Sequence, residues 1–191
     1  MDPFEYIVVL SSLILGLGIA QILTGAADVV SHLQSVKLSL PHSLMVLVIF
    51  VVHIQDWWET YKLIDQVEVW TLLRVFGGLL VFPVLLFTLA RMLFPTGHRA
   101  YETDLNKYYS DQWPWFFFIF LLTIIVSICQ NMMLLGFTLM DQWPLLLYAS
   151  TYAAFLVFRF RNKVAHSIFH GLQLVAWSIF VVMDTSTLII K

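Results

Sequence analysis

Apolar stretches about the length of a membrane-spanning helix follow one another along this chain, with short polar segments between them. A helix that rises ~1.5 Å per residue needs about 20 apolar residues to cross a hydrocarbon core ~30 Å thick. The pattern predicts six such helices, at about residues 4–27, 42–58, 72–94, 114–139, 144–160 and 164–189. We therefore predict an all-α fold, in which residues 1–191 form one polytopic transmembrane helical bundle with an inner-side loop at 95–112.

Proline and tryptophan positions agree with these limits. Pro41, Pro114 and Pro144 lie where the start of a helix tolerates proline, whereas Pro83 falls inside the third stretch and is expected to kink it. The amphipathic tryptophan ring prefers the headgroup layer of a membrane. Six of the seven tryptophans lie at proposed helix ends, namely Trp57, Trp58, Trp70, Trp113, Trp115 and Trp143.

Composition excludes several classes of protein. Of the 191 residues, 60% are apolar and 12% are charged, and the mean hydropathy is +0.86. A soluble domain of this length could not cover such a sequence with polar surface. No basic run indicates nucleic acid as a partner, so the expected partner is the lipid bilayer. Cys129 is the single cysteine, which excludes an intramolecular disulfide and a CxxC motif.

Lysine and arginine positions predict the orientation. Cytoplasmic loops of membrane proteins are enriched in these two residues. With the N-terminus outside, seven of the ten fall on the inner side, namely Lys37, Arg91, Arg99, Lys107, Arg159, Arg161 and Lys163. Three fall on the outer side, namely Lys62, Arg74 and Lys191. The bias predicts an N-out/C-out topology with both termini outside.

Several short motifs stand in the first half of the chain: Phe4-Glu5-Tyr6, Leu15-Gly16-Leu17-Gly18-Ile19 with Gly25, the Trp57-Trp58 pair, Trp70-Thr71 and Pro83. Together they resemble a pattern of an uncharacterised family of small bacterial multi-pass inner-membrane proteins. The resemblance covers roughly the first three predicted helices. It implies the bacterial inner (cytoplasmic) membrane as the location, and it implies no activity.

Polar side chains inside the predicted spans are costly in a bilayer and usually face protein or a water-filled cavity. An outer polar cluster comprises His53, Asp56, Glu59, Arg74, Gln130 and Asn131. Asp56 and Glu59 are three residues apart and share a helix face, and Arg74 lies at a matching depth. Two interpretations stay open, which are a structural ion pair between neighbouring helices and a vestibule that attracts cations.

An inner polar cluster comprises Gln21, Asp28, His42, His166, His170 and Gln173. His166 and His170 are one helical turn apart on one face. Together with His42 and Asp28 they form a candidate ligand set for zinc, and the two histidines alone are a candidate haem edge. The alternatives are a hydrogen-bonded contact between helices and a proton path. Zinc and haem are therefore the possible cofactors.

The run Ala165-His166-Ser167-Ile168-Phe169-His170 resembles the last-helix motif of the adiponectin-receptor and haemolysin III family, whose members are zinc-dependent membrane hydrolases or similar. The resemblance covers about six residues. The early Ser-x-x-x-His of that family is missing from this chain, and the predicted helix count is six and not seven. The family's activity is therefore not transferred to this chain.

Small residues recur at helical spacing and predict close packing faces. On the first helix they form two series, one with Ser12, Gly16 and Ala20 and one with Ser11, Gly18 and Gly25. On the fifth helix Ala149 and Ala153 repeat the pattern. These faces fit packing within the monomer or contacts in a homo-oligomer.

Three functional classes follow from these features. The first is a channel or transporter for an ion, proton or small solute, with the two polar clusters as its vestibules. The second is a metal- or haem-dependent membrane enzyme that uses His166 and His170. The third is a non-catalytic subunit or sensor that works through a partner. The soluble catalytic motifs GxSxG, HExxH, GxGxxG and the P-loop are absent. Transport ranks first, because polar groups occur at both faces and form no nucleophile constellation.

Overall fold

The structure, a computed structural model, describes residues 3–62, 71, 77, 79–95 and 104–189. The regular elements within these residues are six helices, which confirms the all-α prediction. Their bounds are α1 Pro3–Ser31, α2 Leu40–Lys62, α3 Val81–Met92, α4 Leu105–Leu135, α5 Trp143–Phe158 and α6 Lys163–Ile189.

Four segments are long and apolar enough to cross a membrane, namely Ile7–Ser31, Leu40–Thr60, Leu105–Leu135 and Lys163–Met183. α3 and α5 have 12 and 16 residues, so at ~1.5 Å per residue they are shorter than the hydrocarbon core is thick. The predicted start of the third span, at 72–80, lies mostly outside the described residues. The architecture is therefore that of a membrane protein with four long apolar helices, and six spans stay a prediction.

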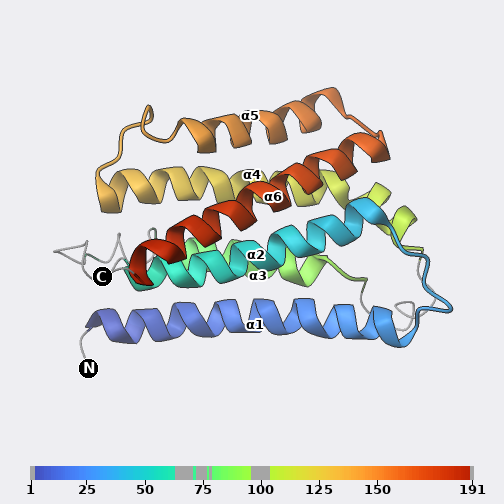
Figure 1. Cartoon of the computed structure of the whole chain (residues 1–191), viewed down its shortest axis with the longest axis horizontal. Coiled ribbons are helices and arrows are strands. Elements are labelled where there is room, and N and C mark those ends of the chain that lie inside the picture. Colours follow the sequence, from blue (N-terminus) through green and yellow to red (C-terminus); the bar gives the residue numbers. More distant parts are fainter. Residues whose placement is uncertain (1–2, 63–70, 72–76, 78, 96–103, 190–191) are drawn as a thin grey trace.

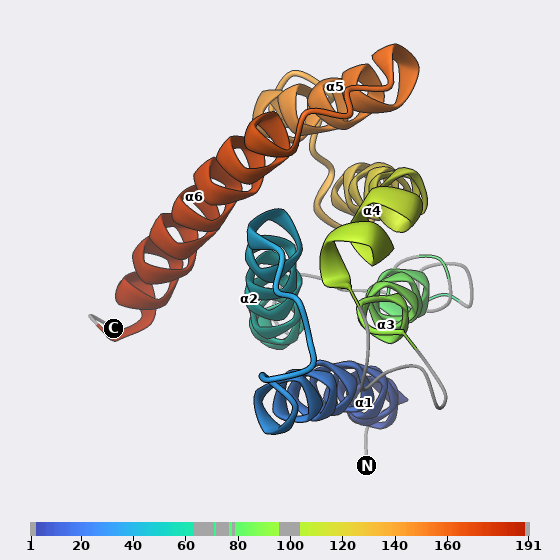
Figure 2. The same ribbon diagram turned by 90° about the vertical axis from the view of Figure 1, so that its right-hand side faces the viewer.

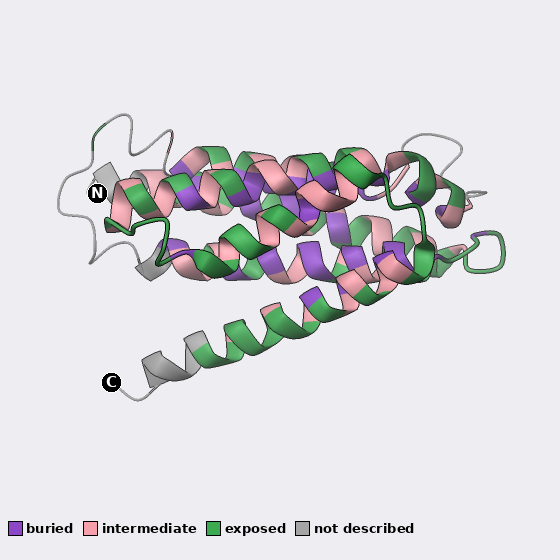
Figure 3. Cartoon of the chain, turned by 90° about the horizontal axis from the view of Figure 1, so that it is seen from above, coloured by how far each residue is buried: buried purple, intermediate pink, exposed green. Residues whose placement is uncertain are grey.

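α1 to α5 run along one common axis, to which α6 is inclined, and successive helices point in opposite directions (Figure 1). The start of α1 and the end of α6 consequently lie at the same end of the bundle. Seen along that axis, α2 and α3 lie beside each other on α1, and α4 and α5 follow beyond α3 (Figure 2). α6 packs on α2 but leaves the bundle at an angle, and much of its second half is exposed (Figure 3).

The core lies between the helices, while the outer faces are apolar as well. The buried side chains include Leu15, Ile49, Leu86, Leu89, Phe116, Phe117 and Tyr152. On the outside, Leu13 and Leu17 of α1 are each 60% exposed. A soluble bundle places polar residues on such faces, so the exposed leucines agree with a surface that contacts lipid.

The surroundings of the glycines of α1 show which of the two predicted packing faces contacts other helices. A Cβ built at Gly18 would lie 2.4 Å from Nε2 of His53 in α2, and one built at Gly25 would strike the ring of Phe94. Gly16, in contrast, has no neighbouring atom within 4 Å. The face with Gly18 and Gly25 is therefore the one that packs within the chain, because helices approach closely where side chains are absent.

The other small residues divide in the same way. Ser11 is buried on the packed face of α1, whereas Ser12 is partly exposed and Ala20 is exposed. The series of Ser12, Gly16 and Ala20 thus lies on the more exposed side of α1, and a contact of this face in a homo-oligomer stays a prediction. On α5, Ala149 packs against the core and Ala153 is half-buried.

The start of α4 corrects the predicted inner-side loop at 95–112 and the predicted fourth span at 114–139. The helix begins at Leu105, where the Asp104 side chain accepts hydrogen bonds from the backbone N–H groups of Asn106 and Lys107. It ends at Gly136, which adopts the left-handed conformation that glycine favours. Pro114 therefore lies inside the helix and does not mark its start.

Three contacts join the α1–α2 connection to the start of α4. The N–H of Leu105 donates to the carbonyl oxygen of Lys37 at 3.0 Å, and the Asn106 side-chain amide donates to the carbonyl of Leu38 at 2.9 Å. The Lys37 ammonium also lies 3.8 Å from the Asp104 carboxylate. Together these contacts fix the first turns of α4 beside the connection between α1 and α2.

Backbone geometry before α3 agrees with the expected effect of Pro83. The described residues Gly77, Leu79 and Leu80 have π-helical hydrogen bonding, and the α-helix proper begins at Val81. A proline ring clashes with the carbonyl oxygen four residues earlier and supplies no N–H. A wider helical turn ahead of the proline relieves that clash, which is how such irregularities arise in long helices.

Candidate functional site

The Tyr109 hydroxyl lies between two buried histidines near the end of the bundle where α4 and α6 begin. Its oxygen is 2.6 Å from Nδ1 of His166 and 3.0 Å from Nε2 of His170. All three side chains are at most 2% exposed. The first turns of α4 supply the tyrosine and those of α6 supply the histidines, so residues 57 and 61 positions apart in the sequence meet here.

Hydrogen bonds extend this contact in both directions. At one end, Nε2 of the His166 imidazole lies 2.7 Å from the carbonyl oxygen of Phe160. At the other end, Nδ1 of His170 lies 3.1 Å from Oε1 of Gln173. The Nε2 of Gln173 donates to the Tyr152 hydroxyl at 2.6 Å. Five side chains thus form one continuous series of hydrogen bonds, which we call the histidine–tyrosine chain: His166, Tyr109, His170, Gln173 and Tyr152.

Aromatic rings surround the two imidazoles. Trp113, Phe117 and Phe155 each place a ring centroid 5.0–5.2 Å from that of His166. The ring of Phe117 also lies 5.5 Å from His170, and that of Phe169 lies 5.4 Å from it. The two imidazoles are therefore surrounded by aromatic side chains. In such surroundings an unpaired polar group lowers the stability of the fold, whereas a hydrogen-bonded one fixes the helices relative to each other.

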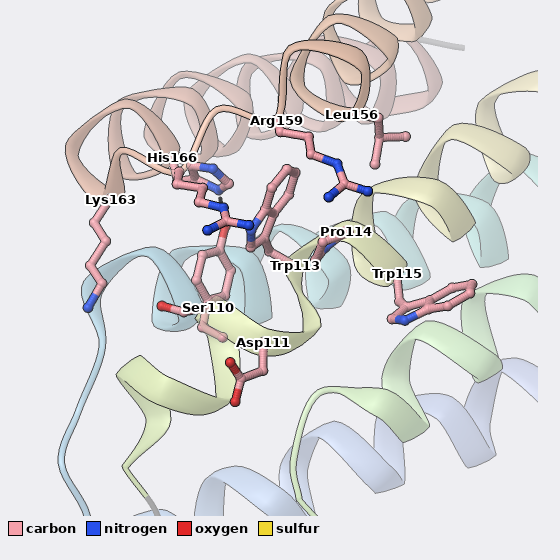
Figure 4. A pocket seen from close by; sticks show the side chains of 11 residues that line it. Ser110, Asp111, Trp113, Pro114, Trp115, Leu156, Arg159, Lys163 and His166 are labelled. Atoms are coloured by element: carbon pink, nitrogen blue, oxygen red, sulfur yellow. Dashed lines mark hydrogen bonds between the residues drawn. The ribbon is translucent and has the colours of Figure 1, made fainter.

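A cavity of about 730 Å³ adjoins the His166 end of the histidine–tyrosine chain. Its lining consists of Tyr109, Ser110, Asp111, Trp113, Pro114, Trp115, Leu156, Arg159, Arg161, Lys163 and His166. Figure 4 shows Arg159 and His166 reaching from the α5–α6 side over Trp113 and Pro114 of α4. The chain thus connects the interior of the bundle with a cavity at the end of three helices.

The inner polar cluster divides into separate parts. Only His166, His170 and Gln173 come together, in the chain described above. Nε2 of His42 lies 2.7 Å from the carbonyl oxygen of Leu93 in the segment after α3. Gln21 accepts a hydrogen bond from Arg91 at 3.3 Å, and Asp28 is exposed.

The expected zinc ligand set does not form. The described residues contain no group of three or more His, Cys, Asp or Glu side chains placed to hold a metal ion, and His42 and Asp28 belong to those residues. In addition, both ring nitrogens of His166 and of His170 are occupied by hydrogen bonds. A metal ion or a haem iron would have to break these bonds, so the arrangement fits neither cofactor well.

The outer polar cluster divides as well. His53 is fully buried, and its Nδ1 lies 2.7 Å from the carbonyl oxygen of Ile49 one turn earlier in α2. Nε2 of His53 and Oδ2 of Asp56 are buried without a hydrogen-bond partner. Glu59 accepts a hydrogen bond from Gln55 of the same helix at 2.7 Å. The expected partner of the two carboxylates, Arg74, lies outside the described residues, so the predicted ion pair stays a prediction.

The remaining members of the outer cluster belong to the end of α4. Asn131 donates from its side-chain amide to Oε1 of the buried Gln142 at 3.0 Å, which ties α4 to the connection before α5. Its neighbour Gln130 is half-buried on the same turn. Asn131 therefore forms a helix-end contact with the connection before α5.

Sequence reasoning missed the two tyrosines that complete the chain. Tyr109 was expected in a loop, and Tyr152 lies inside an apolar stretch where nothing distinguishes it. A signal for the first of them exists: Tyr109, Trp113, Phe116, Phe117 and Phe120 recur at helical spacing, and all five are buried in α4.

Comparison with family models, with curated protein sequences and with solved structures found no match for this chain.

Proposed function

We propose that this chain is a small six-span protein of a bacterial inner membrane, with both termini outside, that transports protons or a small solute together with protons. The observation that supports the proposal is the histidine–tyrosine chain, which runs without a break from a cavity at the bundle end to the buried Tyr152 hydroxyl. Imidazole is the side chain whose ordinary pKa lies nearest to neutral pH, so a buried histidine pair is suited to proton transfer.

Counting donors in the chain identifies where a proton would bind. A carbonyl oxygen only accepts, so Nε2 of His166 carries the hydrogen that it shares with Phe160. In a neutral ring Nδ1 then accepts, and it takes the hydroxyl hydrogen of Tyr109. The Tyr109 oxygen in turn accepts from Nε2–H of His170.

This arrangement leaves two acceptors facing each other. With its hydrogen on Nε2, neutral His170 presents a bare Nδ1 to Oε1 of Gln173 at 3.1 Å. One added proton on Nδ1 turns the ring into an imidazolium that donates to Gln173. A rotation of the Gln173 amide satisfies the neutral ring instead, since its NH₂ then donates to His170 and its oxygen accepts from Tyr152. The chain thus has two bonding patterns that differ by one proton at His170.

A dry layer lies beyond His170. The space lined by His170, Tyr152 and side chains of α2 and α4 does not admit a water molecule, and its other lining residues are Met45, Val48, Ile49, Phe116, Phe117 and Phe120. Proton transfer needs hydrogen-bonded groups or water along the whole path, and this layer supplies neither. The proposal is therefore a gated transporter, in which the apolar layer must rearrange before a proton leaves toward the other end.

Proton flux into reconstituted vesicles tests this function. Vesicles of neutral lipid that enclose a pH-sensitive dye are given a potassium-diffusion potential, and the initial rate of internal acidification is measured. Wild-type protein should acidify the interior faster than protein-free vesicles do. Tyr109→Phe removes the bridging hydroxyl but keeps the ring, so the rate should fall by at least about tenfold, as expected when a positioned proton-transfer group is lost.

Tyr148→Phe is the matched control for the flux experiment. Tyr148 is a half-buried tyrosine of α5 that contacts the ring of Trp177 and lies outside the histidine–tyrosine chain. Its variant should retain the wild-type rate. A wild-type rate in Tyr109→Phe contradicts the proposed function, and equal rates in wild-type and protein-free vesicles contradict transport of protons alone.

The proposed topology has a separate test. Reporter domains that are active only in the cytoplasm, or only outside it, can be fused after Arg161 and after Lys191. The loop of Arg159, Arg161 and Lys163 should report the cytoplasm, and Lys191 should report the outside. A cytoplasmic signal at Lys191 contradicts the six-span model.

A further inference from the structure

We infer that the cavity between α4, α5 and α6 is a binding site for a phosphate group, carried either by an anionic lipid headgroup or by a free phosphate. Its volume of about 730 Å³ lies within the range typical of sites for small ligands. The inference does not rest on the proposed proton transport, because it depends on the cavity's charged rim and not on the buried chain.

Charge is the first argument. Three permanent or near-permanent cations line the cavity, Arg159, Arg161 and Lys163, against the single carboxylate of Asp111. Figure 4 shows the Asp111 carboxylate directed away from the Arg159 guanidinium. Among the described residues the one ion pair within 4 Å joins Lys37 and Asp104, so no described carboxylate neutralises a cation of the cavity at that distance. The charge of Lys163 also acts on Asp104 from farther away.

Geometry is the second argument. Arg159 ends α5 with φ 48° and ψ 47°, and it is the one residue other than glycine with positive φ in the described chain. An arginine in this conformation is under backbone strain, and strain of this kind persists where the surrounding structure fixes it. The turn directs the guanidinium over Trp113 and Pro114 into the cavity (Figure 4).

The chemistry of the lining selects phosphate among anions. A guanidinium offers a planar fork of N–H donors that matches two oxygens of a phosphate, and Lys163 adds a compact charge. Ser110, whose hydroxyl donates to the Asn106 carbonyl oxygen at 2.7 Å, supplies a neutral polar side chain. Trp113 and Trp115 border the same cavity, and such rings favour the headgroup depth of a membrane. A phosphate at the polar end of a lipid, or a soluble phosphate entering from the aqueous side, meets the same donors.

Binding to protein in nanodiscs tests the inference and separates the two sources. The first arm titrates inorganic phosphate into nanodiscs of neutral phosphatidylcholine, at ionic strength held constant with chloride. The second arm titrates phosphatidylglycerol into the protein and counts retained lipids by native mass spectrometry. Saturable binding in the first arm identifies free phosphate as the ligand, and saturable binding in the second alone identifies the lipid headgroup. Binding in neither arm overturns the inference.

Arg159→Gln and Arg161→Gln should each weaken the affinity of the positive arm by about tenfold, as loss of one charge-assisted hydrogen-bond pair does. Lys107→Gln is the matched control, since Lys107 is an exposed cation on the first turns of α4 that does not line the cavity. It should change the affinity less than twofold, and a loss as large as that of Arg159→Gln overturns the inference. Tyr152→Phe removes the last hydroxyl of the histidine–tyrosine chain, and Tyr152 does not line the cavity. This variant should still bind phosphate, so a failure of proton transport leaves the binding result independent.

Discussion

Two buried histidine regions of this protein differ in how their ring nitrogens are bonded. In the first half of α6, His166 and His170 use every ring nitrogen in bonds that reach α4, the α5–α6 connection or Gln173. In the second half of α2, His53 bonds the backbone of its own helix and leaves Nε2 buried without a partner above Gly18. The first region therefore joins helices through directed bonds, whereas the second joins α1 and α2 through close packing.

The contrast separates two uses of a polar residue in an apolar bundle. A bond between side chains of different helices fixes both their spacing and their rotation, and it is costly to break because each partner is left unpaired. A histidine bonded to the backbone of its own helix fills space but does not fix the rotation of a neighbouring helix. The positions of these histidines within the predicted spans made both regions functional candidates. Only the hydrogen bonds of their ring nitrogens distinguish the two regions.

The largest expected difference concerns the histidines themselves. His170→Leu leaves the buried Gln173 side chain and the Tyr109 hydroxyl each short of a partner. At ~1–3 kcal/mol for each of the two groups, the protein should lose about 2–6 kcal/mol of unfolding free energy. His53→Leu removes a ring with an unpaired nitrogen and should change that free energy by less than about 1 kcal/mol. Both values come from denaturant unfolding in detergent micelles, and equal losses would contradict the comparison.

A second prediction tests the packing of α1 on His53. Gly18→Ala places a methyl group 2.4 Å from Nε2 of His53, so the imidazole must shift, and a destabilisation of about 1–3 kcal/mol is expected. Gly16→Ala is the control on the same helix. It meets no atom within 4 Å and should leave stability unchanged or raise it by up to about 1 kcal/mol, because alanine favours a helix over glycine. Thermal unfolding midpoints of the two variants, measured side by side, decide the point.

The smallest expected effect lies at the exposed helix ends. The N–H of Lys107 donates to the Asp104 carboxylate and, with the N–H of Asn106 and the charges of Lys37 and Lys163, holds its pKa below the ordinary value of 3.8. The charged carboxylate therefore stabilises the start of α4 above pH 3.8, and this contribution is lost as the pH falls through the lower pKa of the folded state. The Asp104→Asn variant should lose this part of the acid dependence of the unfolding midpoint.

Asp141 offers the same experiment at the opposite end. The Thr138 hydroxyl and N–H donate to its carboxylate and lower its pKa in the same direction. Asp141→Asn should reduce the acid dependence to a similar small extent, since both carboxylates are solvent-exposed and screened. A large change in acid dependence for only one of the two variants would contradict the expectation that both carboxylates contribute equally little.

The sequence by itself determined the class of the molecule. Apolar stretches of about 20 residues predict helices, and their exposed leucines agree with that interpretation. It also placed His166, His170 and Gln173 on one helical face, which the structure keeps. These features depend on local composition and on the 3.6-residue period, so they can be read along one dimension.

Only the tertiary structure decided which polar groups meet. Two series of small residues on α1 have equally regular spacing, yet only the one with Gly18 and Gly25 faces a neighbour. Likewise, four predicted ligands lie at similar depth, but the rotation of α6 directs its histidines to Tyr109 and leaves His42 and Asp28 elsewhere. Depth in a membrane follows from position in the chain, whereas the pairing of helices and their rotation follow from how whole side chains fit, and that fit is not encoded in any single stretch.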